Sequence, residues 1–214
     1  MLKILFEDHE FIAVEKPIDL PSDLTRDPQR ETAVTQLKNQ RPDLSLVLLH
    51  RLDRDTSGIL LFCKDPSFNH EAALLFQDRK IEKVYTCIVP GSFPKEQMQI
   101  KNYLKLQKIS AKMSIMVSTK SGGKLAITDF NCLKKSNTHS LLEARPLTGR
   151  THQIRVHLSE MGFPIVGEIL YDDPARIEAR LYLHASQLNF TNPRSQQQIK
   201  ILCPPTEDFY EGYF

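Results

Sequence analysis

The sequence has few residues of several kinds, and each shortage excludes a class of protein. It contains no Trp, and its four cysteines are scattered without a Cys-x-x-Cys pair, which argues against a disulfide framework and a zinc site. No apolar run approaches the roughly 20 residues that cross a bilayer. The N-terminus turns acidic at Glu7-Asp8, so it does not read as a secretory signal. The 214-residue chain is therefore expected to be a globular protein of a reducing cytoplasm, without membrane contact.

The charge of the chain is small but uneven. The formal net charge is only +2, which excludes a strongly basic coat protein for nucleic acid. From Lys95 to Lys124, however, seven lysines stand against one acid, Glu96. This segment suits transient contact with a polyanion, and the alternative is a solvated lysine-rich hairpin.

The stretch from His50 to Leu61 places two carboxylates and two guanidiniums between two apolar runs. The runs, Leu46–Leu49 and Ile59–Cys63, are short and rich in branched aliphatic residues, so each is predicted to be a buried strand. A charged segment between buried strands must lie at a sheet edge or in a cleft. A carboxylate held there among arginines is a candidate reactive group. The alternative is a solvated turn whose arginines pair with its aspartates.

A second charged stretch runs from Leu147 to Leu158. Thr151 is predicted to cap a helix whose apolar face carries Ile154, Leu158 and Met161, and Gly162 is expected to end it. On its own, this pattern is equally typical of an amphipathic helix with surface arginines.

The remaining pattern predicts a mixed α/β chain made mostly of short strands. Ser121-Gly122-Gly123 is expected to form a hairpin turn between the strands on either side of it. The predicted strands are residues 4–6, 11–14, 83–91, 113–117, 124–130 and 140–145, and the predicted helices are residues 32–39 and 68–80.

Several strings resemble those of the RluA-like family of pseudouridine synthases, over about residues 11 to 205. They are His-Arg-Leu-Asp-x-x-Thr-Ser-Gly from His50, Lys-x-Tyr from Lys83, Gly-Lys-x-Ala-x-Thr from Gly123, and Thr-Gly-Arg-Thr-His-Gln-Ile-Arg-Val-His from Thr148. Glu15 and Asp19 depart from the family's Asn and Gly.

The resemblance implies an α/β fold with a mixed, mostly antiparallel sheet, flanking helices and a central cleft. It also implies that residues 1–214 form a single catalytic domain, a monomer without an N-terminal accessory RNA-binding domain, because the motif at His50 starts too early to leave room for one. The implied partner is a stem-loop of ribosomal or transfer RNA. The reaction requires no metal and no cofactor, and the sequence offers no site for either.

The resemblance also assigns roles to residues. Asp53 is the essential carboxylate, acting as nucleophile or as base. Tyr85 stacks on the target base and is the candidate to take its C5 proton, and Arg155 is the ion-pair partner of Asp53. Thr56 and Ser57 are expected to cap the backbone after the motif. The residues expected to contact RNA are His50, Arg51, Arg54, Lys83, Arg150 and His152.

Two other functions remain open. A glycoside hydrolase would pair Asp53 with Asp55 or Glu143, although the chain lacks an aromatic tract for stacking sugars. An inactive RNA-binding domain is the third hypothesis, and the presence of Asp53, Tyr85 and Arg155 argues against it. Target choice would depend on residues 18–31 and 95–124, where the chain is least like the family.

Overall fold

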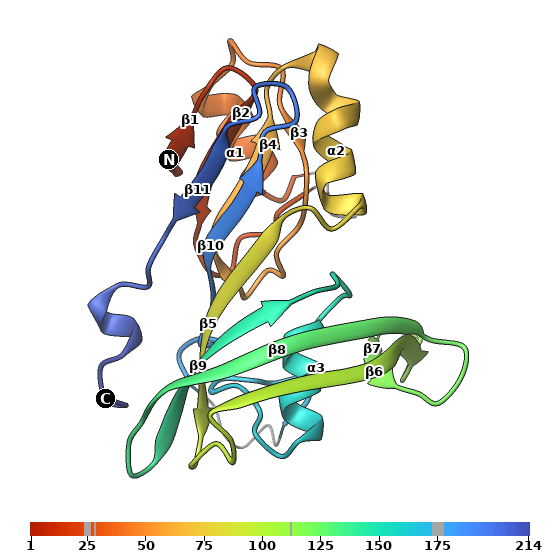
Figure 1. Ribbon diagram of the computed structural model, residues 1–214, viewed down its shortest axis with the longest axis vertical. Coiled ribbons are helices and arrows are strands. Elements are labelled where there is room, and N and C mark those ends of the chain that lie inside the picture. The colour runs from red at the N-terminus through yellow and green to blue at the C-terminus, as the bar shows by residue number, and fades with distance from the viewer. Residues whose placement is uncertain (24–26, 28, 112, 173–177) are drawn as a thin grey trace. The chain divides into compact units, whose positions relative to one another are not determined.

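The computed structural model describes residues 1–23, 27, 29–111, 113–172 and 178–214, which form two compact units (Figure 1). Unit 1 comprises Met1–Lys83 and His184–Pro205, and unit 2 comprises Val84–Leu183 and Thr206–Phe214. Strands β5 (Glu82–Pro90) and β10 (Leu183–Thr191) each have residues in both units. The two units are described separately below.

The sheet of unit 1 is centred on β4 (Ser57–Cys63), in which every residue is buried. Its order is β1 (Lys3–Glu7), β2 (Phe11–Lys16), β4, β10 and β11 (Gln198–Leu202). β10 runs parallel to β4, and the other pairs are antiparallel. The two-residue strand β3 (Val47–Leu48) pairs with the C-terminal end of β4. The predicted strands at residues 4–6, 11–14 and 59–63 are confirmed.

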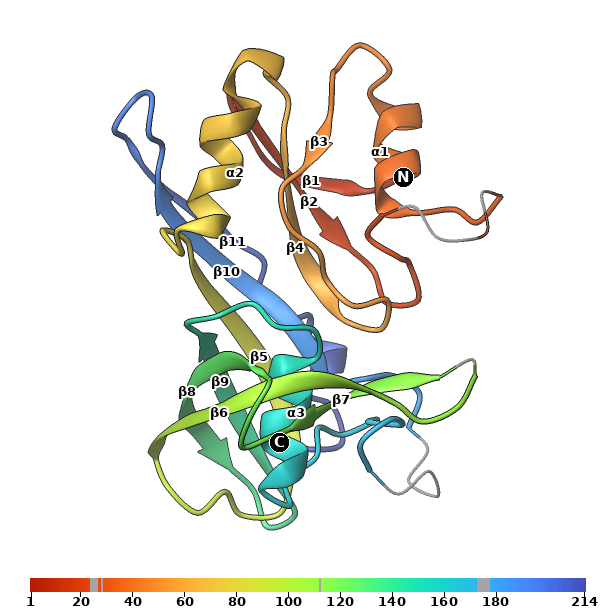
Figure 2. The same cartoon turned by 90° about the vertical axis from the view of Figure 1, so that its right-hand side faces the viewer.

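Two helices flank the strands of unit 1, on opposite sides in Figure 2. α1 (Ala33–Gln40) begins at Thr32, whose hydroxyl accepts a hydrogen bond from the amide of Thr35 in a capping box. α2 (Asn69–Gln77) follows the short 3-10 turn η1 (Pro66–Phe68), which Asp65 caps. The α2 face packs on a cluster formed by alternate residues of the strands. That cluster contains Phe11, Ala13, Ile59, Leu61, Phe68, Ala72, Leu75, Leu188 and Phe190.

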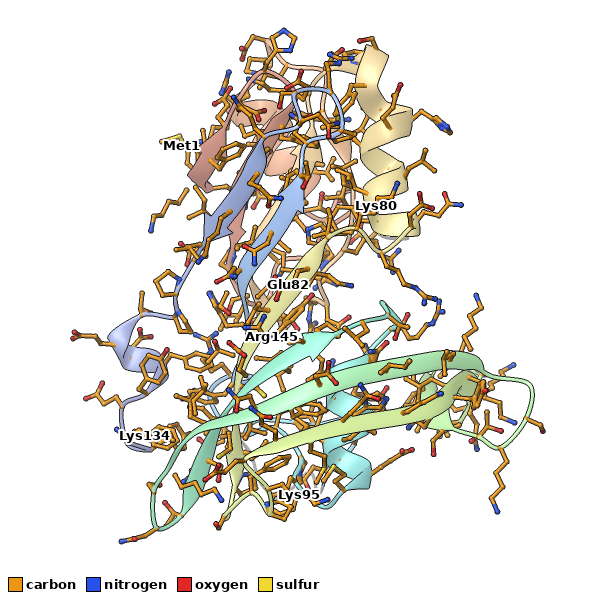
Figure 3. The ribbon with its side chains drawn as sticks, in the orientation of Figure 1. Met1, Lys80, Glu82, Lys95, Lys134 and Arg145 are labelled. Atoms are coloured by element: carbon orange, nitrogen blue, oxygen red, sulfur yellow. The ribbon has the colours of Figure 1, made fainter. Side chains whose placement is uncertain are left out.

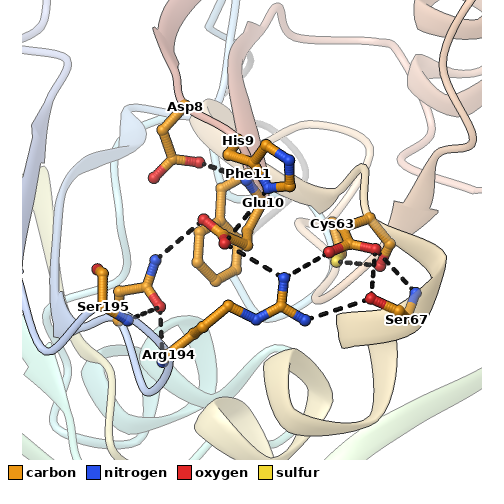
Figure 4. Close-up of polar contacts among 10 residues, drawn as sticks. Asp8, His9, Glu10, Phe11, Cys63, Ser67, Arg194 and Ser195 are labelled. Atoms are coloured by element: carbon orange, nitrogen blue, oxygen red, sulfur yellow. Dashed lines mark hydrogen bonds and ion pairs between the residues drawn. The ribbon is translucent and has the colours of Figure 1, made fainter.

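Arg194, in the turn between β10 and β11, fastens that turn to the rest of unit 1 (Figure 4). Its NH1 donates to Asp65 at 2.6 Å and to Glu10 at 3.4 Å, and its NH2 donates to Ser67 at 3.3 Å. The guanidinium lies 4.5 Å from the ring centroid of Phe68. One cation therefore joins the turn before β2, the η1 turn and the β10–β11 turn, which are distant in the sequence.

The sheet of unit 2 is antiparallel throughout, in the order β5, β9 (His139–Pro146), β8 (Lys124–Lys135), β6 (Gln97–Lys108) and β7 (Ser114–Ser118). Helix α3 (Gln153–Glu160) packs on one face of it through Ile154 and Leu158. On the other face, the C-terminal segment with η2 (Glu207–Phe209) packs Phe209 against Ile88 and Leu141. The mixed, mostly antiparallel architecture expected from the sequence is confirmed.

Three local predictions were wrong. Val47 is 39% exposed rather than buried, because β3 contributes only a two-residue pairing at the end of β4. Ser121-Gly122-Gly123 does not close a hairpin, because β7 and β8 both pair with β6 and not with each other. Thr151 does not cap α3: the cap position is His152, in the left-handed region at φ 52°, and no side chain makes a cap hydrogen bond there.

Candidate active site

The loop that carries Asp53 in unit 1 is fixed through its backbone. The hydroxyl of Ser22 donates to the carbonyl of Leu52 at 2.7 Å and accepts from its amide at 3.0 Å. The carbonyl of Asp53 accepts from the amide of Thr56 at 3.1 Å, which makes a tight turn. The loop therefore holds the half-buried Asp53 side chain on a backbone that is bonded on both sides of it.

Lys16 is the third tether of this loop. Its side chain is fully buried, and its Nζ donates to the carbonyls of Arg54 at 2.9 Å, Pro17 at 2.7 Å and Leu20 at 2.8 Å. Burial lowers the pKa of Lys16 to about 8, and the charges of Asp55, Asp53 and Asp19 oppose that shift. The lysine thus adds a cation whose charge acts on Asp53 as well as on the loop that carries it.

Ser57 begins β4 immediately after the loop, and its hydroxyl is 2.8 Å from Nδ1 of His184 on β10. Nε2 of the same imidazole is 2.7 Å from the carbonyl oxygen of Cys203, which can only accept. Nε2 therefore carries a proton, and in the neutral imidazole the Ser57 hydroxyl donates to Nδ1. The prediction that Thr56 caps the backbone was wrong, because its buried hydroxyl makes no hydrogen bond with the described residues. The backbone cap by Ser57 stays a prediction.

Of the predicted RNA contacts in unit 1, Arg51 and Arg54 are exposed on the loop, and His50 is half-buried. Arg54 pairs with Asp55, with Nε 2.8 Å from Oδ1. The His50 imidazole stacks on Phe76 at 4.6 Å, and its Nε2 accepts from the amide of Leu61 at 3.2 Å. Burial, assisted by the charge of Lys83, lowers the pKa of His50 to about 3, so this imidazole is neutral.

In unit 2, Tyr85 lies half-buried on β5, opposite Ala144 of β9. Its ring packs against the cluster that includes Cys87, Ile154 and Leu183. Alternation along the strand places Tyr85 and Cys87 on the face of the sheet that α3 covers. The ring is therefore supported on one side by the core of unit 2.

Arg155 on α3 makes a buried, two-pronged ion pair with Glu168. Its Nε is 2.6 Å from Oε2 and its NH2 is 2.7 Å from Oε1, and the two side chains are 2% and 0% exposed. Glu168 also accepts from the amide of Leu170 at 2.8 Å. The turn before it requires glycine, because Gly167 has φ +81° and a Cβ there would lie 1.8 Å from the carbonyl oxygen of Arg180. The guanidinium plane is thus fixed by a carboxylate that the motif itself does not contain.

Tyr171 connects β7 with the start of α3. Its hydroxyl accepts from the amide of Met116 at 3.1 Å and lies 2.6 Å from Nδ1 of His152. The Arg155 guanidinium carbon lies 5.6 Å from the centroid of the Tyr171 ring. Tyr171 therefore contacts one residue predicted to bind RNA and one predicted to be catalytic.

Arg150 and Gln153 fasten the segment before α3 to β8. Arg150 Nε donates to the carbonyl of Leu125 at 2.9 Å. The Gln153 amide group donates to the carbonyl of Ile127 and to the hydroxyl of Thr128, each at 2.9 Å, and its oxygen accepts from the amide of Arg150 at 3.1 Å. The buried Gln153 therefore holds the bend that presents Arg150.

Within each unit the structure groups the predicted residues. Unit 1 carries His50, Arg51, Asp53, Arg54 and Lys83, and unit 2 carries Tyr85, Arg150, His152 and Arg155. Sequence reasoning missed the polar residues that support them, which are the buried Lys16, Ser22, Gln153, Glu168 and His184 and the half-buried Tyr171. The available signal was weak: Gln153 lies inside a recognised string, but nothing in the sequence pairs any of the six residues with its partner.

Two features of the described ranges bear on other functions. No group of three or more His, Cys, Asp or Glu side chains in them is arranged to hold a metal ion. No helix in the same ranges is long and apolar enough to cross a membrane.

Comparison with solved structures assigns the fold to one class. The human RNA pseudouridylate synthase domain-containing protein 1 aligns with 96% of this chain and 84% of its own, at a TM-score of 0.82 and 26% identity. The sequence pattern of the RNA pseudouridylate synthase family matches residues 10–160. The chain belongs to this family of RNA isomerases, in its RluA-like branch.

Two curated relatives define how far the similarity extends. Ribosomal large subunit pseudouridine synthase C of Buchnera aphidicola is 36% identical over 94% of this chain and 66% of its own length. Ribosomal large subunit pseudouridine synthase D of Neisseria meningitidis serogroup A is 31% identical over 98% of this chain and 59% of its own length. The chain therefore spans about three fifths to two thirds of the length of these relatives.

Proposed function

We propose that this protein converts specific uridines of RNA to pseudouridine, with Asp53 as the essential carboxylate. The observation that carries the proposal is the loop of Asp53, held by Ser22 at Leu52, by Lys16 at Arg54 and by the turn to Thr56. A reactive group must be positioned closely, and a backbone bonded on both sides of it does this. Family membership makes uridine isomerisation the reaction that this carboxylate serves.

The reaction breaks the bond between uracil N1 and ribose C1′, turns the base and joins C5 to C1′. Asp53 supplies the nucleophile or the base, and the ring of Tyr85 holds the detached uracil and takes the C5 proton. Arg155 keeps the Asp53 carboxylate ionised and oriented. The target uridine must leave its stack to be reached, and the proposed role of Arg51 is to fill its place.

The remaining contacts are proposed by residue type and exposure. Arg51, Arg54, Lys83 and Arg150 supply cations for phosphate groups. His50 and His152 complete the set, although His50 is held neutral by its burial between Phe76 and the Leu61 amide. Its part is therefore to position the loop rather than to neutralise phosphate.

We propose ribosomal RNA as the substrate, because the two relatives above are named for the large ribosomal subunit. Transfer RNA is the second class to test. We also propose that residues 1–214 act as one catalytic domain and as a cytoplasmic monomer. The family pattern supports the single domain, because it runs from residue 10 to residue 160 through both units.

The test is to map pseudouridines in total RNA from cells that lack the gene, and from the same cells complemented with each variant. Wild type and the surface control Asp78→Asn should restore the lost sites, whereas Asp53→Asn should not. Restoration by a folded Asp53→Asn protein would refute the assignment of Asp53. No lost site in any RNA would refute the function itself.

The role of Tyr85 is separable from that of Asp53. Tyr85→Phe retains the ring for stacking but has no hydroxyl to take a proton. Substrate binding should therefore stay within about 2-fold, while the rate of C5 hydrogen release falls by about 10²-fold or more, the usual contribution of general acid–base catalysis. An unchanged release rate in single-turnover assays would show that another group takes the proton.

A further inference from the structure

One face of the sheet in unit 2 carries an exposed tyrosine between two exposed lysines. Lys101, Tyr103 and Lys105 alternate along β6, and Tyr103 is 46% exposed. Alternate residues of a strand point to the same face, so these three side chains stand in one row, about 7 Å apart. Figure 3 shows side chains standing along β6 and β8, and Figure 2 shows β6 from a second direction.

Partly buried aliphatic residues flank this row. By strand register, Ile127 lies opposite Lys101 and Leu125 opposite Tyr103 on β8, and Val117 lies opposite Lys105 on β7. We call these six residues the β6 face: Lys101, Tyr103, Lys105, Val117, Leu125 and Ile127. It is an apolar floor with one aromatic ring and a cation on each side of the ring.

The electrostatics of the β6 face favour an anion. Residues 97–127 contain six lysines and no Asp or Glu. By strand register, the next acids on the same face are Asp129, which accepts from Gln99 at 2.7 Å, and Glu143, which pairs with Arg145 of β9 at 2.8 Å.

Neither Lys101 nor Lys105 has an ion-pair partner in the described part of the chain. Glu160 of α3 contacts Asn102 and the amide of Ser118, which belong to the opposite face.

The described elements of unit 2 cover other parts of the sheet. α3 packs Val156 against Leu104 and Ala126, whose side chains point away from the β6 face. The C-terminal segment lies on the same side of the sheet as the β6 face, but at the β5–β9 end, where Phe209 meets Ile88 and Leu141. The β6 face is therefore the part of that side that these two elements leave open.

We propose that the β6 face binds a single-stranded segment of the RNA substrate, with a base stacked on Tyr103 and phosphates at Lys101 and Lys105. A ring with cations on both sides is the combination that binds single strands without reading sequence. Charge complementarity selects a polyanion, and the exposed ring selects one that carries bases. The proposal rests on the proposed function for its occupant, because an enzyme acting on RNA meets single strands beside its target.

The experiment measures binding of a short fluorescent oligouridylate by anisotropy over a series of salt concentrations. The variants are Lys101→Gln/Lys105→Gln, Tyr103→Ala and Tyr103→Phe, with Lys200→Gln on the exposed face of β11 as the matched control. The double variant should reduce the slope of log K against log salt by about 1.4, at about 0.7 for each lost phosphate contact on a single strand. Tyr103→Ala should weaken binding roughly 5- to 100-fold through loss of stacking, and Tyr103→Phe should not.

Each other outcome overturns the proposal. No binding by the unchanged protein, or binding by the double variant equal to wild type, would show that the β6 face holds no RNA. Equal affinity of Tyr103→Ala and Tyr103→Phe would remove the stacking role. If the variants, including Tyr103→Ala, lose as much affinity for heparin as for oligouridylate, the β6 face binds anions in general. Failure of the proposed function is seen separately, as absence of pseudouridine formation, and it leaves the oligouridylate result readable.

Discussion

The ion pair between Arg155 and Glu168 gives the sharpest prediction for stability. Removing the carboxylate by Glu168→Ala takes away two short hydrogen bonds, 2.6 Å and 2.7 Å, from a guanidinium that is only 2% exposed. A hydrogen bond to a charged group contributes about 1.5–3 kcal/mol, so the two together contribute about 3–6 kcal/mol. Breaking a buried pair from one side typically costs about 3–5 kcal/mol, in agreement with that sum. We therefore expect the free energy of unfolding to fall by about 3–5 kcal/mol.

The assay is equilibrium unfolding in urea, followed by far-UV circular dichroism because the chain has no Trp. With a denaturant dependence near 2 kcal/mol per molar, the midpoint should fall by about 1.5–2.5 M. Amide hydrogen exchange in α3, residues 153–160, should accelerate in the same variant. Glu71→Ala is the control, because Glu71 is an exposed carboxylate on helix α2, and it should stay within about 0.5 kcal/mol of wild type.

A double variant separates stability from catalysis. Arg155→Met/Glu168→Leu replaces the pair by apolar groups of similar volume, a change that is often neutral or stabilising. It should recover most of the stability that Glu168→Ala loses, yet it should form no pseudouridine. A loss below about 1 kcal/mol for Glu168→Ala would refute the reasoning, since two hydrogen bonds to a buried guanidinium should contribute more than that.

Three further outcomes are expected from buried groups. Gly167→Ala should be strongly destabilising in thermal unfolding, because its Cβ would lie 1.8 Å from the Arg180 carbonyl oxygen. The control Gly122→Ala, with open space around it, should cost only about 1 kcal/mol. Equal losses of stability in the two variants would contradict this prediction. Burial lowers the pKa of His157 to about 4, so between about pH 6.5 and pH 4 the unfolded chain binds a proton that the folded one does not. Stability should therefore fall as the pH drops through that window, and His157→Gln should flatten that part of the urea midpoint curve; an unchanged slope would argue against it. Lys16→Met leaves three carbonyls without their donor, at about 1–3 kcal/mol for each unpaired group, and so loosens the loop of Asp53. We expect the single-turnover rate to fall at least about 10-fold. A wild-type rate would show that the loop needs no tether.

The elements predicted most accurately are those whose pattern is local. Ile59–Cys63 was predicted as a buried strand because every residue in it is apolar, and β4 is buried along its whole length. Thr32 and the residues after it predict the start of a helix, and Thr32 is the N-cap of α1. Such signals depend only on neighbours in the sequence, so tertiary structure does not override them.

The wrong predictions share a physical cause, which is competition from distant parts of the chain. The glycines at 122 and 123 allow a tight turn, but β6 provides the hydrogen-bonding partner for both flanking strands. Thr151 is a good capping residue in isolation. The buried Gln153 instead bonds the backbone of Arg150 and Ile127, and this fixes the approach to the helix in another geometry.

The residues of the candidate site also divide into those that the sequence predicts and those that it does not. The strings containing Asp53, Tyr85 and Arg155 are recognisable without a structure, and their roles remain predictions. Their supports are not recognisable, because Lys16 and Asp53, or Arg155 and Glu168, are related by folding and by no spacing rule. A sequence therefore predicts the reactive groups more readily than it predicts the residues that hold them in place.

The supporting residues indicate that the predicted groups of each unit are held in place before substrate arrives. Lys16, Gln153 and Glu168 are all buried, and each makes at least two hydrogen bonds. Burying three polar side chains costs free energy unless every bond is made, so the native fold strongly favours the one arrangement that makes them. The competing hydrolase hypothesis requires a second available carboxylate, but Asp55 is bound by Arg54 and Glu143 by Arg145. In the described residues, buried polar contacts instead support the loop of Asp53 in unit 1 and the guanidinium of Arg155 in unit 2, the two groups that the proposed isomerisation requires.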